Sequence, residues 1–554
     1  MDGGRRDRLP GRPPSLRTLA AVGLGLAAGL TAVLLTWFWR GDPAFVLSGW
    51  FQGDMPTYVC YGRMTLESAT TLTYASPHDI RPEPAAWLVN LPITVTGWLL
   101  AAGVPGGWAG HALRLLFAPP MYAALGLLLR SIFRPGRWFW AAFLIVGVGG
   151  GFAWLGALVE VDLAAEHWPR AWRAAVKDLE SPYYWWFLDV FRNLTYPLEL
   201  AYHAIVLAQL WALGNRRHGL SVVCFALACL SNPFVGIQAA GVECTTLALA
   251  WVRRRPRPSV RVTAAALAVA AAFVGYYAVL LPMDPAIRSL QEQHQHDLAD
   301  PMTLESLLVG YGPALLAPLT LLDPSFRRWT WRRFAPVPLF VLAAWTAVLT
   351  QNTRFLEPDQ SLMPMHFSRG WLQVALWPIL LAWLQHRARH RVLRRPLEAL
   401  ALALVVATLP DNALFVEDMY AVAPHRSSLR WDRNYEEVHA LLREGPDRRV
   451  LVDSWMLGRQ ICGLYERHRS AIGTHLTTPG YAERQAEIRA FRRDPTREGP
   501  MLRWADLMVV GAEDHGWVRA AEASGRWEEV LCNPRWCVYE RVPPAASPPG
   551  NSGD

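Results

Sequence analysis

Residues 19–39 read LAAVGLGLAAGLTAVLLTWFW, an uninterrupted apolar stretch that follows a basic segment and ends in aromatic residues. About 20 apolar residues in a helix are long enough to cross the hydrocarbon core of a bilayer. A cleaved signal peptide would have a shorter apolar core and a small-residue cleavage site, so we expect a retained first transmembrane helix. The arginines from Arg5 to Arg17 predict a cytoplasmic N-terminus.

Apolar runs of the same kind recur along the chain as far as residue 410. They predict an all-α polytopic membrane bundle of about eleven transmembrane helices. The expected spans are 18–39, 111–132, 138–158, 198–214, 219–235, 236–252, 262–282, 304–322, 336–350, 371–387 and 397–410.

Arginines between these runs give the orientation. With a cytoplasmic N-terminus, alternate connections should be cytoplasmic and rich in basic residues. The connections that fit contain Arg130/Arg134/Arg137, Arg216/Arg217, residues 253–261, Arg327/Arg328/Arg332/Arg333 and residues 387–395. The alternation holds only if residues 85–104 lie at the outer interface without crossing. An odd number of spans then places the C-terminal region outside the membrane.

The chain divides by composition into a membrane part and a soluble part. We expect a cytoplasmic basic tail at 1–17 and a transmembrane domain at 18–410, with a large first outer loop at 40–110. A linker at 411–427 should lead to an extracytoplasmic α/β domain at 428–543 and a disordered tail at 544–554. Expected strands in the α/β domain are 449–454, 470–474 and 507–511, with a hairpin at 528–541; expected helices are 481–493 and 515–524. For Cys532 and Cys537 of this hairpin, a disulfide and two free thiols both stay open.

The formal net charge is +8, and it is carried almost entirely by arginine, because Lys177 is the only lysine. Since the arginines cluster between apolar runs, they are interpreted as topology signals and not as a nucleic-acid surface. The arginine bias is typical of high-GC bacteria, which suggests a bacterial plasma (inner) membrane protein. The sequence contains no P-loop, dinucleotide-binding glycine pattern, nucleophile elbow or zinc-protease motif.

Several short segments occur in a recognisable order. An early loop contains Gly53-Asp54-Met55-Pro56-Thr57-Tyr58, and residues 76–84 read SPHDIRPEP. Residues 230–234 read LSNPF, and residues 473–478 of the soluble domain read GTHLTT. This order resembles the membrane glycosyltransferases of the GT-C superfold that use polyprenyl-phosphate sugars, in particular the bacterial mannosyltransferase and aminoarabinose-transferase group. The resemblance implies transfer of a sugar from a polyprenyl-phosphate donor to a lipid, glycan or protein acceptor at the outer face of the membrane.

The resemblance makes Asp54 the expected catalytic base. An Asp is ionised at neutral pH and can accept the proton of an acceptor hydroxyl or amide as that group attacks the anomeric carbon. Such a single displacement inverts the anomeric configuration. The departing phosphate needs cationic support, which the forked donors of arginine supply.

The candidate substrate-binding residues lie in the outer loops. They are His78, Arg81, Glu160, Asp162, Arg192, Arg354, Asp359, His366 and Arg369. The pair Glu160 and Asp162 has the chemistry to bind Mg²⁺ or Mn²⁺, but several branches of the family work without a metal, so no metal site is assigned.

Two other classes of function remain open. A transporter or flippase for a lipid-linked glycan is compatible with the break at Asn232-Pro233 and with His203 inside an apolar run. A non-catalytic assembly protein of envelope polysaccharide synthesis would use the external domain to recruit a partner. Retention of function in Asp54→Asn would favour either of these over the transferase.

Overall fold

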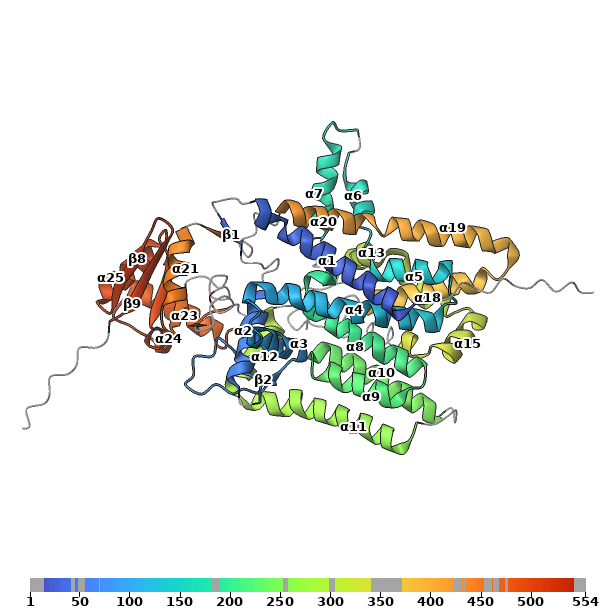
Figure 1. Cartoon of the computed structure of the whole chain (residues 1–554), viewed down its shortest axis with the longest axis horizontal. Helices are drawn as coiled ribbons and strands as arrows, with labels where there is room; N and C mark the ends of the chain where they lie inside the picture. Colours follow the sequence, from blue (N-terminus) through green and yellow to red (C-terminus); the bar gives the residue numbers. More distant parts are fainter. Residues whose placement is uncertain are drawn as a thin grey trace, which may run out of the picture.

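The computed structural model describes residues 14–40, 45–47, 55–68, 70–162, 164–180, 190–252, 258–297, 304–339, 371–422, 430–432, 434–452, 461, 468–473 and 477–542. Within these residues the protein is a bundle of long helices with a small mixed α/β domain beside one end (Figure 1). We call this end of the bundle the domain end and the opposite one the far end.

Five described helical segments are long and apolar enough to cross a membrane, and a bent helix pair would make a sixth. They are Leu16–Leu35 in α1 (Leu16–Arg40), α4 (Gly106–Ile132), α10 (Pro233–Val252), Val260–Met283 with α11 (Val260–Gly275), and Arg391–Glu417, which joins α19 (Arg391–Ala407) to α20 (Pro410–Val422). Several helices of this length and composition are typical of a multi-pass helical membrane protein. The described helices do not establish the predicted count of eleven spans.

Two predicted spans are broken. The span 138–158 is divided into α5 (Arg137–Gly147) and α6 (Ala153–Glu160), and Gly149–Gly151 lie between them. The span 304–322 consists of α13 (Leu304–Tyr311), a short 3₁₀ turn and α14 (Ala317–Thr320), after which the chain bends by 97° into α15 (Pro324–Arg333). The predicted linker 411–427 is helical as far as Val422. These residues belong to α20, which continues the membrane segment that begins with α19. Most of span 336–350 lies outside the described residues.

The central helix of the bundle is α4, which packs against α1 and against α8 (Pro197–Gly214). Small residues allow the close approach. A Cβ on Gly23 of α1 would lie 2.6 Å from the carbonyl oxygen of Ala118 in α4, and Leu19 fills the space above Gly126. Small residues at the contacts are the usual way in which helices associate within a bilayer.

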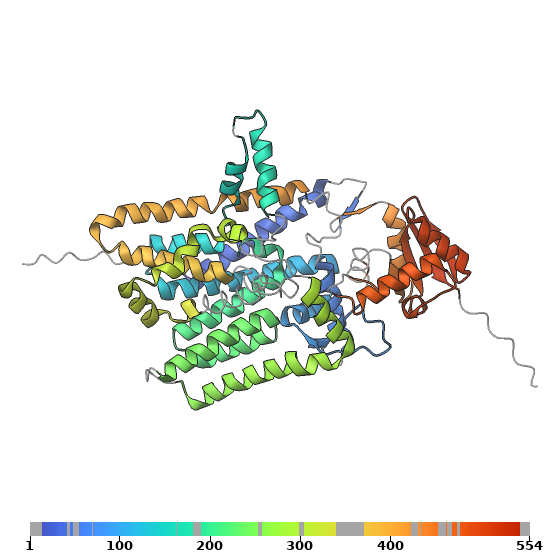
Figure 2. The same ribbon diagram turned by 180° about the vertical axis from the view of Figure 1, so that it is seen from behind.

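The direction of the helices agrees with the arginine pattern of the sequence. Helix α1 begins at the far end, and the connections from α4 to α5 and from α18 (Trp371–Arg387) to α19 are also at that end (Figures 1 and 2). These connections contain the arginine-rich turns. The N-terminal start of the bundle and the C-terminal domain are therefore at opposite ends.

The long first loop covers the domain end. It contains α2 (Met55–Glu67), a two-stranded ribbon of β2 (Thr73–Tyr74) and β3 (Leu88–Val89), and α3 (Leu91–Ala101). Because α3 has 11 residues, it is only about 16 Å long and too short to cross a bilayer. Asn90 caps its N-terminus by accepting a hydrogen bond from the backbone N–H of Ile93.

The C-terminal domain contains a five-stranded sheet in the order β6-β5-β7-β9-β8. Its strands are β5 (Arg449–Val452), β6 (Arg469–Ser470), β7 (Leu507–Gly511), β8 (Trp527–Cys532) and β9 (Trp536–Arg541), and its helices are α21 (Asn434–Glu444), α23 (Tyr481–Arg493), α24 (Pro500–Trp504) and α25 (His515–Ser524). β5 is parallel to both β6 and β7, and β9 is antiparallel to its two neighbours. The expected strand 507–511, the hairpin and both helices are confirmed, and β5 matches the start of the expected strand 449–454. Of the expected strand 470–474, only Ser470 belongs to β6, and residues 471–473 are not strand. A further ribbon pairs β1 (Phe45–Leu47) with β4 (Arg430–Asp432).

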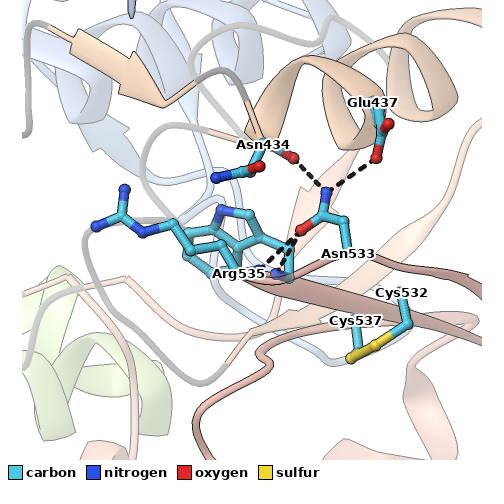
Figure 3. The surroundings of a disulfide bond; sticks show 7 residues. Asn434, Glu437, Cys532, Asn533, Arg535 and Cys537 are labelled. Atoms are coloured by element: carbon cyan, nitrogen blue, oxygen red, sulfur yellow. Dashed lines mark hydrogen bonds between the residues drawn. A yellow bond between two sulfur atoms is a disulfide. The ribbon is translucent and has the colours of Figure 1, made fainter. Parts of the chain in front are cut away.

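A disulfide joins Cys532 to Cys537 across the β8–β9 hairpin (Figure 3). In the turn between them, the side-chain amide of Asn533 donates hydrogen bonds to the carbonyl of Asn434 and to the carboxylate of Glu437 in α21. The hairpin tip is therefore tied to the first helix of the domain. Of the two alternatives left by the sequence, the structure contains the disulfide.

Candidate functional site

Five predicted site residues lie outside the described residues: Asp54, Arg354, Asp359, His366 and Arg369. Asp54 immediately precedes Met55, where α2 begins. The surroundings of α2 are therefore the part of the described structure that bears most directly on the predicted base.

A cavity of about 410 Å³ lies between α2 and the C-terminal domain, and we call it the junction cavity. On the α2 side it is lined by Cys60, Arg63, Met64 and Glu67. On the domain side it is lined by residues at the N-terminal ends of β5 and β6 and by Asp506 just before β7. The cavity joins the first loop to the last domain of the chain.

The charged lining of the junction cavity consists of four arginines and three carboxylates: Arg63, Arg448, Arg449 and Arg469, and Glu67, Asp447 and Asp506. Arg449 is paired with Asp506, to which its Nε and Nη2 donate at 2.9 and 2.5 Å, and Arg448 is paired with Glu540 outside the lining. Burial alone would raise the pKa of Asp506, but the hydrogen bonds from Arg449 outweigh it and hold that pKa below its usual value.

Arg469 differs from these paired arginines. Its Nε and Nη2 atoms are buried and have no hydrogen-bond partner within the described part of the chain. Arg63 enters the cavity from α2 and is only 7% exposed. Because a buried guanidinium donor without a partner costs about 1–3 kcal/mol or more, Arg469 is suited to an anionic ligand.

His78 holds the first loop to the C-terminal domain. Its ring is fully buried, and Nδ1 lies 3.0 Å from the carbonyl oxygen of Ser470. Arg484 of α23 donates to the carbonyl oxygens of His78 and Ala471, and Ser76 donates to the carbonyl of Thr477 at 3.0 Å. Burial lowers the pKa of Arg484 to about 10, so it remains charged at neutral pH. In this position His78 positions the domain and does not face the junction cavity.

Arg81 is also engaged within the protein. Its guanidinium binds the carboxylate of Asp79 through Nε and Nη2, and its Nη2 lies 3.0 Å from both carboxylate oxygens of Asp284. The hydrogen bond with Asp79 is the main reason why the pKa of Arg81 lies above its ordinary value. Since two nearly buried carboxylates already neutralise this one cation, the structure does not support Arg81 as a phosphate ligand.

Arg192 lies inside the bundle and is not an accessible loop arginine. It is fully buried, with Nε donating to Asn412 at 2.8 Å and Nη2 donating to the carbonyl of Asp411 at 2.8 Å. The carboxylate of Asp411 in turn accepts hydrogen bonds from the backbone N–H groups of Ala153 and Trp154 at the start of α6. This network connects Arg192 to the break between α5 and α6, and a substrate-binding role for Arg192 stays a prediction.

Glu160 and Asp162 are exposed at the turn from α6 to α7 (Trp168–Glu180). The α6–α7 hairpin projects sideways from the bundle, away from the C-terminal domain (Figure 1). Asp162 accepts a hydrogen bond from the backbone N–H of Ala164. Among the described residues, no group of three or more His, Cys, Asp or Glu side chains is arranged to bind a metal, so this pair has no further acidic ligand beside it.

Sequence reasoning missed a buried carboxylate within the bundle. Glu243 of α10 is fully buried and accepts hydrogen bonds from Gln209 of α8 at 3.0 Å and from Ser221 of α9 (His218–Cys229) at 2.8 Å. The signal in the sequence was a lone Glu within an apolar run. By contrast, Nδ1 of His203 is bonded to the carbonyl of Glu199 one turn earlier, and Asn232 caps α10.

No protein-family model matches this sequence, and no curated protein shows significant similarity to it.

Proposed function

We propose that this protein is a membrane glycosyltransferase that transfers a sugar from a polyprenyl-phosphate donor to an acceptor at the domain end of the bundle, outside the cytoplasm. The observation that carries the proposal is the junction cavity. It is lined by the buried Arg63 and by Arg469, of which Nε and Nη2 are buried, and it lies beside the helix that starts immediately after Asp54. A transferase acting on a phosphate-linked donor needs an anion-binding group close to its base.

The compartment assignment has independent support. The Cys532–Cys537 disulfide is of a kind that persists in oxidising compartments. The arginine-rich turns at the far end are of the kind found on cytoplasmic faces. Both features favour a domain end outside the cytoplasm.

The proposed chemistry uses one protein base. The acceptor oxygen or nitrogen attacks the anomeric carbon, and its proton passes to the carboxylate of Asp54. The bond between the anomeric carbon and the donor phosphate breaks, and its electron pair leaves with the phosphate. Arg63 and Arg469 bind an anionic group of the substrate at the junction cavity.

Donor turnover in membrane vesicles tests this proposal. The native chain would be compared with Asp54→Asn and Arg469→Gln on a panel of polyprenyl-phosphate sugars, with loss of the sugar measured by mass spectrometry. We expect Asp54→Asn to lower turnover at least 100-fold and Arg469→Gln to lower kcat/KM about 10- to 100-fold. The matched control is Asp494→Asn, because Asp494 follows α23 and, among the residues that the structure describes, its side chain bonds only to its neighbours Thr496 and Arg497. Equal turnover by Asp54→Asn and the native protein would remove Asp54 from the reaction.

A flippase for a lipid-linked glycan is the second candidate, and Glu243 is the observation that favours it. Ionisable residues within membrane helices are costly and frequently functional. Under this reading, Glu243→Gln stops lipid translocation while Asp54→Asn leaves it intact. Under the transferase reading, Glu243 supports packing only, and the Gln variant retains turnover because its amide can still bond to Gln209 and Ser221.

A further inference from the structure

A second cavity, of about 690 Å³, lies at the far end of the bundle. It is formed where the turn between α4 and α5 meets the end of α18 and the start of α19, with Trp329 of α15 at its side. We call it the far-end cavity. It is on the opposite side of the bundle from the junction cavity, so the proposed transfer reaction does not use it.

The lining of the far-end cavity is strongly basic, with five arginines and one carboxylate. The arginines are Arg134, Arg137, Arg389, Arg391 and Arg394, and the carboxylate is Glu398. Glu398 is already paired with Arg137 and with Arg394, whose Nε lies 3.2 Å from Oε1. Within the described part of the chain, no carboxylate pairs with the other three arginines.

The position of the cavity along the bundle indicates the kind of ligand. Ile132, in its lining, is the last residue of one membrane-crossing segment, and Arg391 is the first residue of another. The cavity is therefore at the level where the hydrocarbon core meets the polar head groups. The side chain of Arg389 lies over the ring of Trp329 with 5.9 Å between the guanidinium carbon and the ring centroid, which helps to orient this cation.

The helix that begins at the cavity, α19, has exposed apolar side chains. On α19, which leads away from the cavity into the bundle, Val392 is 87% exposed, Leu402 is 64% exposed and Leu400 is 45% exposed. A free phosphate ion would use only the arginines. A phospholipid would use the arginines for its head group and exposed apolar side chains of α19 for its tails.

We propose that the far-end cavity binds the phosphodiester head group of an anionic phospholipid, with the acyl chains lying along α19. Arg134, Arg389 and Arg391 bind the phosphate oxygens through charge-assisted hydrogen bonds. An arginine turn that acts only as a topology signal needs neither a concave lining nor several guanidinium groups that line it without a carboxylate partner among the described residues.

Lipid binding by the full-length protein in a neutral detergent tests this proposal. Phosphatidylglycerol, phosphatidylcholine and inorganic phosphate would be titrated separately, and bound lipid would be counted by native mass spectrometry. We expect phosphatidylglycerol to bind more tightly than phosphatidylcholine. The triple variant Arg134→Gln/Arg389→Gln/Arg391→Gln should bind phosphatidylglycerol roughly 100-fold more weakly, at about fivefold per arginine.

Two further variants complete the design. The double variant Arg216→Gln/Arg217→Gln removes arginines from the turn between α8 and α9, outside the cavity, and should bind like the native protein. Glu398→Gln releases Arg137 and Arg394 and should strengthen phosphatidylglycerol binding severalfold, which keeps the proposal testable if the triple variant fails to fold. Unchanged or weaker binding by Glu398→Gln, unchanged binding by the triple variant, or inorganic phosphate binding as tightly as the lipid would overturn the proposal.

Discussion

The contact between Gly473 and His78 gives a quantitative prediction. A Cβ on Gly473 would lie 2.5 Å from Cδ2 and 2.7 Å from Cε1 of the His78 ring, which is too close for carbon atoms. The ring is fully buried, and Nδ1 is held by the carbonyl of Ser470, so it has little room to move. Gly473 has no positive φ, so steric overlap is the whole cost of Gly473→Ala. Overpacking of this kind costs about 1–3 kcal/mol.

A double-mutant cycle isolates this contact. In the His78→Ala background the ring is absent, so adding Gly473→Ala should cost close to nothing, and the coupling free energy should be about 1–3 kcal/mol. The midpoint of urea unfolding, measured by pulse proteolysis of the full-length protein in detergent, should fall by roughly 0.5–1.5 M for Gly473→Ala alone. Gly516→Ala in α25 is the control, because its Cβ would meet only Asp514 at 3.4 Å, and it should be neutral or stabilising. An equal loss for Gly473→Ala in both backgrounds would refute the steric argument.

Three further predictions concern other parts of the structure. Asp411→Ala leaves the two backbone N–H donors at the start of α6 without their acceptor and should lower the stability by about 2–4 kcal/mol. Asp411→Asn keeps one acceptor oxygen and should cost less. Equal thermal midpoints for the two variants would contradict the capping role. Without reductant, Cys532 and Cys537 should resist alkylation under denaturing conditions and each gain one label after reduction; labelling before reduction would exclude the disulfide. Because the pKa of Asp506 is depressed in the folded state, its pair with Arg449 stabilises the fold above the ordinary Asp pKa near 4 and loses this effect as pH falls through the folded pKa. Asp506→Asn should therefore cost less than about 1 kcal/mol at pH 7, because the pair is partly exposed, and the cost should shrink as the pH is lowered into the acid range, as measured by urea midpoints.

Features set by neighbouring residues could be predicted from the sequence. The expected strand and helices of the C-terminal domain form at residues 507–511, 481–493 and 515–524. Hydrophobic periodicity, helix caps and turn residues specify them, and each of these signals depends on residues only a few positions apart. The ends of α4 and α8 also lie close to the ends of the apolar runs.

Features set by distant contacts could not be predicted. Arg192 looked like a loop arginine because Asp411 and Asn412, which hold it, are more than 200 positions later in the chain. The break between α5 and α6 is also in contact with this later segment, since the backbone N–H of Gly150 donates to the carbonyl of Thr408 at 2.5 Å. Arg63 and Arg469 line the same junction cavity although they are far apart in the sequence, and nothing local to either residue signals the other.

The docking of His78 onto Ser470 has a consequence for the timing of biogenesis. The two residues are 392 positions apart, so a ribosome working at 5–20 residues per second makes the second roughly 20–80 s after the first. During that interval the early loop has already been synthesised, while the strand that will cover its histidine does not yet exist. The ring of His78 is therefore not held by the carbonyl of Ser470 until the last domain is made. A nascent chain that stops before residue 470 would present this uncovered surface to the proteases and chaperones that monitor membrane protein assembly.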